Sequence, residues 1–192
     1  MSKIFWMIII LSLILIVGCT QTSDSPGILE TAPERTLGDS NNPETNNEGS
    51  SWMTLTLKDL NSGQSFKLTD FQGKKILLES FAVWCPVCTS QQRNIKKLHE
   101  ELGDGFVSIA LDTDPNEDED LVKNHAQSNE FDWRYAVAPK AMTQALVDEF
   151  GIGIVSAPSA PMILICEDGS TRFLQRGLKS VNELKEELEN GC

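Results

Sequence analysis

Apolar residues recur at strand-like and helix-like intervals from Trp52 to the C-terminus of this chain. Mostly apolar or alternating runs predict strands at residues 75–81, 106–111, 161–166 and 171–174. Apolar positions three or four residues apart predict helices at residues 86–102, 121–128 and 141–150, and a closing helix from Val181. Alternating residues 54–57 and 65–68, on either side of the turn signal Asn61-Ser62-Gly63, predict an N-terminal β-hairpin. Strands that alternate with helices in this way predict an α/β sandwich with a mixed sheet.

A different pattern occupies the first 19 residues. Residues 4–17 hold 13 apolar residues among 14, with Lys3 before them and Gly18-Cys19 after them. This run is short for a helix that crosses about 30 Å of hydrocarbon, but it has the length and flanks of a secretory signal. Its end, Ile16-Val17-Gly18-Cys19, resembles the lipobox of prokaryotic lipoproteins, in which the signal is cut before the cysteine and the thiol is lipidated. An uncleaved anchor helix is the alternative, and both interpretations tether an outward-facing domain to a membrane.

Residues 20–51 are rich in Ser, Thr, Asn, Pro, Gly and Glu and contain few apolar residues. Such a segment buries too little surface to offset its ordering entropy, so we expect a disordered linker. The 192 residues are thus predicted to comprise a signal peptide at 1–18, the anchor cysteine and linker at 19–51, and one folded domain at 52–192. The formal net charge of −12 argues against nucleic acid as a partner.

The most informative motif is Trp84-Cys85-Pro86-Val87-Cys88, where a predicted buried strand is followed by a predicted helix. Unpaired N–H groups and the positive end of the helix dipole stabilise a thiolate in that position. Because the thiolate is the nucleophile in thiol–disulfide exchange, we expect Cys85 to attack or be attacked, and Cys88, one turn later, to resolve the mixed disulfide. Pro86 fits the first helical turn, where its missing N–H has no intrahelical partner. This redox pair needs no separate cofactor.

A C-x-x-C pair also occurs in zinc sites and, less favourably, as a purely structural disulfide. A four-ligand zinc site needs a second pair of ligands, and Cys166 and Cys192 lie far apart in the sequence. We therefore expect no metal site. In a compartment that permits disulfides, Cys166 and Cys192 either form a structural bridge or remain a buried residue and a free terminal thiol, and the sequence leaves both open.

The residues around the motif resemble the thioredoxin superfamily, and within it the TlpA/ResA-like membrane-tethered thiol–disulfide oxidoreductases. The resemblance runs from Trp52 to Cys192 and rests on residues 68–74 (LTDFQGK), residues 81–88 (FAVWCPVC) and a proline eight residues before Gly169. It implies a thioredoxin-like three-layer sandwich, with a mixed central sheet flanked by helices and an N-terminal β-hairpin. It also implies a cis proline that faces the redox pair, preceded by a residue whose backbone meets the partner. Ala160-Pro161 matches that position, with Pro158 as the competitor.

Two more positions gain a role from the resemblance. Glu79 interrupts an apolar strand six positions before Cys85, where thioredoxins place a buried acid. Burial raises the pKa of such a carboxyl group, which then exchanges a proton with Cys88; the alternative is a strand-edge glutamate that reaches solvent. Trp84 is expected to be a surface aromatic that contacts partners, together with Pro86, Ala160 and Pro161, whereas a buried Trp84 is the alternative. Trp52 and Trp133 are expected in the core.

Six acidic residues gather within Asp112–Asp120. The run lacks the glycine and the final glutamate of a calcium loop, so we expect a solvated loop and favourable acids at a helix start. His99 and His125 lie in charged helical segments and are expected at the surface.

Together these features predict an enzyme, a lipid-anchored extracytoplasmic thiol–disulfide oxidoreductase. The resemblance implies that its partners are exported protein thiols or disulfides and a membrane electron donor or acceptor, and we expect a monomer. Two other classes are the alternatives. A copper-delivery module on the same fold would use Cys85, Cys88 and Met162 as soft ligands, and a peroxiredoxin would carry its reactive cysteine in a different loop.

Overall fold

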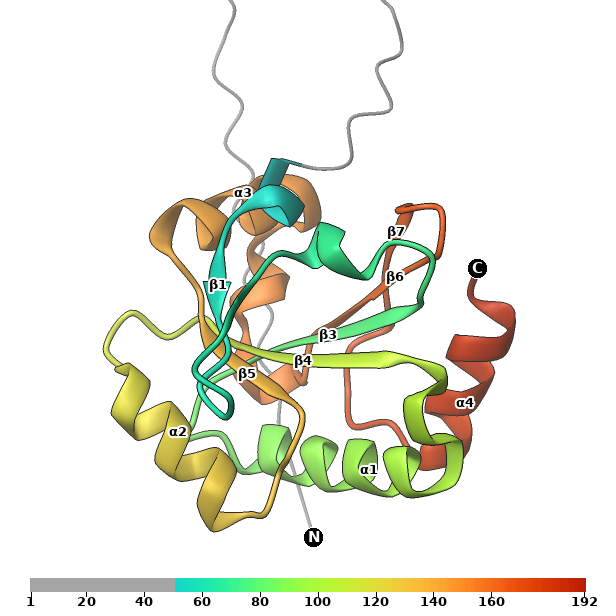
Figure 1. Cartoon of the computed structure of the whole chain (residues 1–192), viewed down its shortest axis with the longest axis horizontal. Coiled ribbons are helices and arrows are strands. Elements are labelled where there is room, and N and C mark those ends of the chain that lie inside the picture. The colour runs from blue at the N-terminus through green and yellow to red at the C-terminus, as the bar shows by residue number, and fades with distance from the viewer. Residues whose placement is uncertain (1–50) are drawn as a thin grey trace, which may run out of the picture. The chain divides into compact units, whose positions relative to one another are not determined.

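The computed structural model describes residues 51–192, and Figure 1 shows how their elements are arranged. The main sheet has five strands in the order β5-β4-β3-β6-β7. They are β3 (Ile76–Phe81), β4 (Val107–Asp112), β5 (Arg134–Val137), β6 (Met162–Ile165) and β7 (Thr171–Phe173). Strands β3, β4 and β5 are parallel, β6 is antiparallel to β3, and β7 is antiparallel to β6. The predicted mixed sheet is therefore confirmed, with β3 at its centre and β5 as a strand that the sequence pattern did not predict.

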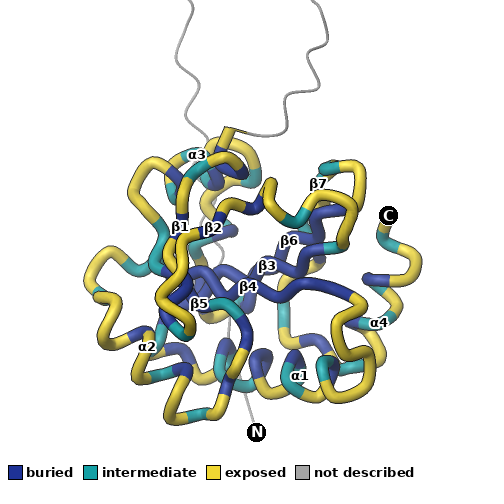
Figure 2. Tube along the Cα trace, in the orientation of Figure 1, coloured by how far each residue is buried: buried dark blue, intermediate teal, exposed yellow. Residues whose placement is uncertain are grey.

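Helices cover both faces of this sheet, as Figure 1 shows. One layer holds α1 (Pro86–Leu102), α2 (Glu119–Ser128) and α4 (Val181–Asn190), and the other holds α3 (Lys140–Phe150). Successive side chains of a strand point to opposite faces. Leu77 and Phe81 accordingly pack in the core with α1, α2 and α4, whereas Ile76 and Leu78 pack in the core with α3. Every residue of β3 is buried, and Figure 2 shows the central strands inside the two layers.

The N-terminal hairpin is present but shorter than predicted. Strands β1 (Leu57–Lys58) and β2 (Ser65–Phe66) pair antiparallel as a separate two-stranded sheet. The hairpin is short because the chain turns at once after Lys58: the N–H of Gly63 donates to the carbonyl of Asp59, and the N–H of Leu60 donates to that of Tyr135 in β5. The second of these bonds ties the hairpin to the edge of the main sheet.

Five short 3-10 helices complete the described chain. They are η1 (Ser51–Thr54), η2 (Leu68–Phe71), η3 (Gly103–Gly105), η4 (Ile152–Val155) and η5 (Ala157–Ser159). The last two form the connection from α3 to β6 and bring its backbone close to α1. The sequence gives no signal for this connection, because short 3-10 turns tolerate many residue types.

The expected core tryptophans are confirmed. Trp52 and Trp133 are both buried, and Nε1 of Trp52 donates to Oε2 of Glu149 at 2.7 Å. Among residues 51–192, no helix has the length and apolar content needed to cross a membrane. The predicted signal peptide, the lipidated Cys19 and all of the predicted linker except Ser51 lie outside the described residues, and Ser51 is the first residue of η1.

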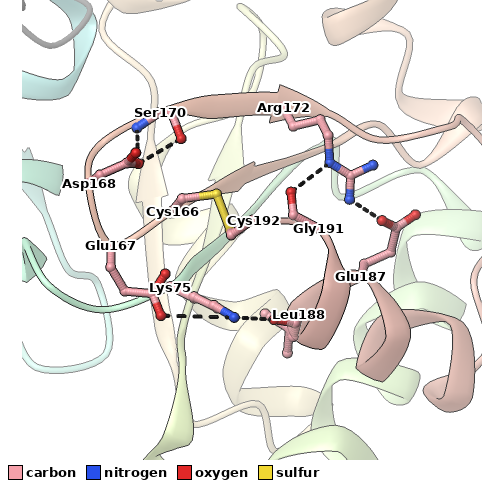
Figure 3. The surroundings of a disulfide bond; sticks show 10 residues. All are labelled: Lys75, Cys166, Glu167, Asp168, Ser170, Arg172, Glu187, Leu188, Gly191 and Cys192. Carbon is pink, nitrogen blue, oxygen red and sulfur yellow. Dashed lines mark hydrogen bonds and ion pairs between the residues drawn. A yellow bond between two sulfur atoms is a disulfide. The ribbon is translucent and has the colours of Figure 1, made fainter.

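A disulfide joins Cys166 and Cys192, which settles the alternative that the sequence leaves open. Cys166 directly follows β6, and Cys192 is the last residue of the sequence (Figure 3). Two cationic side chains hold the same end of α4: Nζ of Lys75 donates to the carbonyl of Leu188 at 2.5 Å, and Nε of Arg172 donates to that of Gly191 at 3.1 Å. The end of the chain is therefore fastened to the sheet both covalently and by hydrogen bonds.

We predict that loss of this disulfide lowers the stability of the domain. Its two cysteines are separated by 26 residues, and a crosslink over a loop of this size restricts the unfolded chain by about 3 kcal/mol. In a Cys85→Ala/Cys88→Ala background, Cys192→Ser should lower the free energy of unfolding in urea by about 2–4 kcal/mol. Dithiothreitol should reproduce the loss in the background protein and leave the Cys192→Ser protein unchanged. Equal unfolding midpoints with and without this bond would show that it contributes nothing to stability.

Candidate active site

The two cysteines of the sequence motif lie where β3 is followed by α1. Cys85 is the N-cap residue of α1, with an extended backbone, and Pro86 is the first helical residue. The Cys85 sulfur accepts the N–H of Cys88 at 3.1 Å, which is the hydrogen bond that a serine or aspartate side chain makes at most N-caps. Cys85 thus lies at the positive end of a 17-residue helix. Local geometry therefore supports the predicted nucleophile at Cys85.

A single backbone carbonyl accepts hydrogen bonds from both thiols. The Sγ atoms of Cys85 and Cys88 donate to the carbonyl of Ala157 at 3.3 and 3.0 Å. Both cysteines are free thiols and fully buried. Ala157 begins η5, and because it acts through its backbone, its residue type gave no signal in the sequence. Since no part of either thiol reaches solvent, a partner sulfur reaches Cys85 only when its surroundings move.

Glu79 is a buried residue and not a strand-edge one. It is 1% exposed, and neither of its carboxyl oxygens has a hydrogen-bond partner within residues 51–192. Burial raises the pKa of this carboxyl group to about 8, against a smaller lowering by the Gln92 amide. Burial also raises the pKa of the Cys88 thiol well above its ordinary value, and the hydrogen bond with Cys85 and the charge of Glu79 add to that effect. The resolving thiol therefore holds its proton tightly beside a carboxyl group that titrates near neutral pH.

The acidic run after β4 is only partly the solvated loop that we expected. Oε2 of Glu117 accepts the N–H of Val83 at 2.6 Å, and Oε1 accepts the N–H of Trp84 at 3.3 Å. Oδ2 of Asp114 accepts Nε1 of Trp84 at 2.7 Å. The two acids thus hold the segment that enters Cys85. Sequence reasoning missed this role because the partners lie 30 to 34 positions apart and the acids carry no motif.

Other acids in this run behave differently. Asp112 is fully buried at the end of β4, and burial raises its pKa to about 7, with the charge of Glu117 adding to the rise. Asp118 is the N-cap of α2 and accepts the N–H of Leu121 at 2.8 Å. The predicted favourable acid at a helix start is therefore confirmed, whereas Asp112 belongs to the interior.

The four predicted partner-contact residues divide into two kinds. Trp84 is 58% exposed and Pro86 is also exposed, so both lie on the surface beside the dithiol. Ala160 and Pro161 are buried. Their backbones are engaged internally, since the N–H of Ala160 donates to Ala157 and the carbonyl of Pro161 accepts from Ser80.

The expected cis bond between Ala160 and Pro161 is wrong for this structure. Every peptide bond in residues 51–192 is trans, including those before Pro158 and Pro161. The turn after η5 is made instead by Ala160, whose backbone is left-handed with φ 43° and ψ 60°. The turn before β6 therefore contains a left-handed residue and no cis bond.

A mostly apolar groove of about 340 Å³ adjoins the dithiol. It is lined by Ala82 and Ala157, whose carbonyls accept hydrogen bonds from Cys85, and by residues of the loop after β4, of α3 and of η4. Ile152, which is 74% exposed, lies at this groove. Together with Trp84 it gives the surface near the cysteines an apolar character that suits a protein partner.

The histidines are not the surface residues that the sequence suggested. His99 and His125 are both half-buried, and Nε2 of each lies within hydrogen-bond distance of a neighbour, Ser108 Oγ at 2.9 Å and Gln92 Oε1 at 2.7 Å. Burial lowers the pKa of both imidazoles. In the part of the chain that the structure describes, no three His, Cys, Asp or Glu side chains group as metal ligands.

This fold and this dithiol define a thioredoxin-like thiol–disulfide oxidoreductase. The chain belongs to the Redoxin family, whose model matches residues 41–188. It is similar to the thioredoxin-like protein YneN of Bacillus subtilis, at 26% identity over 74% of this chain and 79% of that protein. It is also similar to the thiol-disulfide oxidoreductase ResA of Bacillus thuringiensis, at 27% identity over 66% of this chain and 69% of that protein.

Solved structures share the fold at lower identity. The thioredoxin domain of a thiol-disulfide oxidoreductase from Bacteroides vulgatus superposes with a TM-score of 0.56 at 21% identity, over 70% of this chain and 93% of that one. The pneumococcal exposed lipoprotein thioredoxin from Streptococcus pneumoniae gives a TM-score of 0.57 at 19% identity, over 70% and 97%. These likenesses confirm the thioredoxin-like architecture expected from the sequence.

We predict that Glu117 positions the nucleophile. Glu117→Ala removes the acceptor for two N–H groups before Cys85, so thiol–disulfide exchange should slow several-fold and the free energy of unfolding should fall by about 1–3 kcal/mol. Glu119→Ala is the matched control, because it removes an equal charge from a nearby exposed side chain paired with Lys58. Exchange rates measured with a small disulfide reagent should separate the two variants. Equal rates would mean that the Glu117 contacts do not position Cys85.

Proposed function

We propose that this protein is a lipid-anchored extracytoplasmic oxidoreductase that exchanges disulfides with exported proteins through Cys85 and Cys88. The observation that carries the proposal is the pair of free thiols at the N-terminus of α1, one turn apart and bonded to a single carbonyl. The signal-like residues 4–19, the similarity to ResA and the likeness to an exposed lipoprotein thioredoxin support the location. A membrane electron donor or acceptor would return the pair to its starting redox state.

The exchange with a partner disulfide has two steps. The Cys85 thiolate attacks one sulfur of the partner, a Cys85–partner bond forms, and the partner's second sulfur leaves as a thiolate that takes up a proton. Cys88 then loses its proton to Glu79 and attacks the Cys85 sulfur, which releases the first partner sulfur as a thiolate that also takes up a proton. The partner gains two electrons and two protons, and Cys85 and Cys88 end as a disulfide. The reverse sequence oxidises a partner dithiol.

Glu79 is the proton acceptor for Cys88 in the second step. The pKa of the Cys88 thiol is raised by burial, so its deprotonation by solvent is unfavourable. The Glu79 carboxyl group is buried with it, and its own raised pKa near 8 makes it a base of useful strength near neutral pH.

Partners contact the exposed side chains of Trp84 and Pro86 and the adjoining apolar groove. The contribution of Ala160 and Pro161 is indirect, because they lie beneath that surface and shape the connection that carries Ala157. No specific observation in the described residues supports copper delivery or peroxidase activity. Met162, the third ligand of the copper alternative, is fully buried in β6.

We predict that Glu79→Gln slows protein disulfide reduction in a pH-dependent way. Below pH 8 Glu79 is mostly protonated and above pH 8 it is a carboxylate, so the advantage of the natural protein over the variant should grow as pH rises through 8. At pH 9 the difference should be about tenfold or more, at the low end of general base catalysis. Insulin reduction between pH 6 and 9 measures both rates, and taking their ratio cancels any pH dependence that the two proteins share. A ratio that stays constant over this range would exclude Glu79 as the base.

Two cysteine variants show whether the assay reports the proposed exchange. Cys85→Ser should abolish insulin reduction, and Cys88→Ser should accumulate a mixed disulfide with insulin that mass spectrometry detects. Turnover that survives in Cys85→Ser would overturn the assignment of the nucleophile.

We predict that Cys19→Ala prevents lipid attachment in the producing bacterium. The natural chain should be recovered in the membrane fraction with the mass of residues 19–192 plus lipid, and globomycin should block its processing. The Cys19→Ala chain should keep its signal segment and insulin reductase activity. Identical masses and identical membrane partition for both chains would rule out the lipobox.

A further inference from the structure

Four polar side chains lie within the apolar core between the sheet and the layer of α1 and α2. Glu79 of β3 is paired in register with Ala110 of β4, which is paired with Tyr135 of β5. Neighbouring strands are about 4.8 Å apart, so Glu79 and Tyr135 face the same side of the sheet with only the small Ala110 between them. Gln92 of α1 and His125 of α2 complete this group, which we call the Glu79 cluster.

The cluster has a hydrogen-bond direction. Oε1 of Gln92 is 2.7 Å from Nε2 of His125. A carbonyl oxygen only accepts, so His125 is the donor and carries its hydrogen on Nε2. The other end of the Gln92 amide, which only donates, is then left for the Glu79 carboxylate. Nε2 of Gln92 and both carboxyl oxygens of Glu79 are buried and have no hydrogen-bond partner among residues 51–192.

The position of Gln92 on α1 relates it to the redox pair. It follows Cys88 by four residues and therefore lies one turn further on the same helix face. Gln92 is fully buried, whereas His125 is half-buried and reaches the surface of α2. The two residues thus form a polar connection from the surface of α2 to the buried carboxyl group of Glu79.

We propose that Gln92 and His125 are positioning residues for Glu79. His125 holds the Gln92 amide so that its N–H groups face the Glu79 carboxylate and stabilise it relative to the protonated carboxyl group. The proposal rests on the proposed role of Glu79 as the proton acceptor for Cys88. The amide opposes the rise in the pKa of Glu79 that burial causes, in agreement with this geometry.

Few other titratable or charged groups face the cluster. From α1 they are Cys88, whose pKa is raised partly by Glu79, and Arg93, whose charge lowers the pKa of His125 after the larger effect of burial. From β5 it is Tyr135, whose buried hydroxyl has its pKa raised by burial and then by Glu79. The rings of Phe81 and Phe131 lie 5.7 and 6.0 Å from the His125 ring, centroid to centroid. Near pH 8 His125 is therefore neutral, and the interaction that remains to affect the Glu79 carboxyl group is the one with the Gln92 amide.

The test compares Gln92→Leu with Gln91→Leu. Both glutamines are fully buried in α1, but Gln91 bonds to the backbone N–H and carbonyl of Lys179 on the side facing α4. The readout is the titration of the Glu79 carboxyl carbon by ¹³C NMR in reduced full-length protein labelled at glutamate, with Glu79→Gln to assign the signal. Gln92→Leu should raise the titration midpoint by about one pH unit, because a charged acceptor loses its donor. Gln91→Leu should leave the midpoint in place and lower only stability.

A second pair keeps the test decisive if Gln92→Leu does not fold. His125→Phe should raise the same midpoint by a smaller amount, whereas His99→Phe, which removes the half-buried histidine bonded to Ser108, should not move it. An unchanged midpoint in both Gln92→Leu and His125→Phe, or an equal shift in the two controls, would overturn the proposal. If Glu79→Gln reduces insulin at the natural rate while Gln92→Leu still moves the midpoint, the proton-acceptor role fails and the positioning role stands.

Discussion

The short connection between β3 and α1 determines where the chemistry takes place. Residues 82–85 join a strand that is buried along its whole length to a helix that begins at Pro86. Because β3 is paired on both sides, by β4 and by β6, the position of its end is fixed. A connection of only four residues then restricts where α1 can begin. The Cys85 sulfur is therefore placed by the pairing of the sheet. The acids of the loop after β4 then hold the connection from outside, through backbone groups of Val83 and Trp84.

The same central strand carries a residue that opposes folding. The pKa of Glu79 is 4.5 in an ordinary setting and about 8 in the folded chain, so between these values the folded state binds the proton more strongly than the unfolded one. Stability contributed by this group accordingly falls as pH rises from about 4.5 to 8. Asp112, with a pKa near 7, acts in the same direction. A buried carboxyl group without a cation beside it lowers the stability of the domain. Its position next to Cys88 is where such a group can take part in proton transfer.

Periodicity and the C-x-x-C motif were enough to predict four strands of the main sheet, the four helices and the dithiol, because each is a local pattern. The resemblance to thioredoxins added the burial of Glu79. β5 escaped prediction because Arg134–Val137 is short and begins with a charged residue. Ala157 and Glu117 escaped because one acts through its backbone and the other through partners more than thirty residues away. His125 was misjudged because a charged helix gives no sign of a buried glutamine on its neighbour.

The carbonyl of Ala157 accepts from both thiols and also from the N–H of Ala160. A disulfide between Cys85 and Cys88 has no S–H group, so oxidation removes two of these three donors in one event. The reduced form thus holds the connection between α3 and β6 against the dithiol more firmly than the oxidised form does. Ala157 also lines the apolar groove, so oxidation of the dithiol changes the hydrogen bonding of a residue that borders the surface proposed for partners.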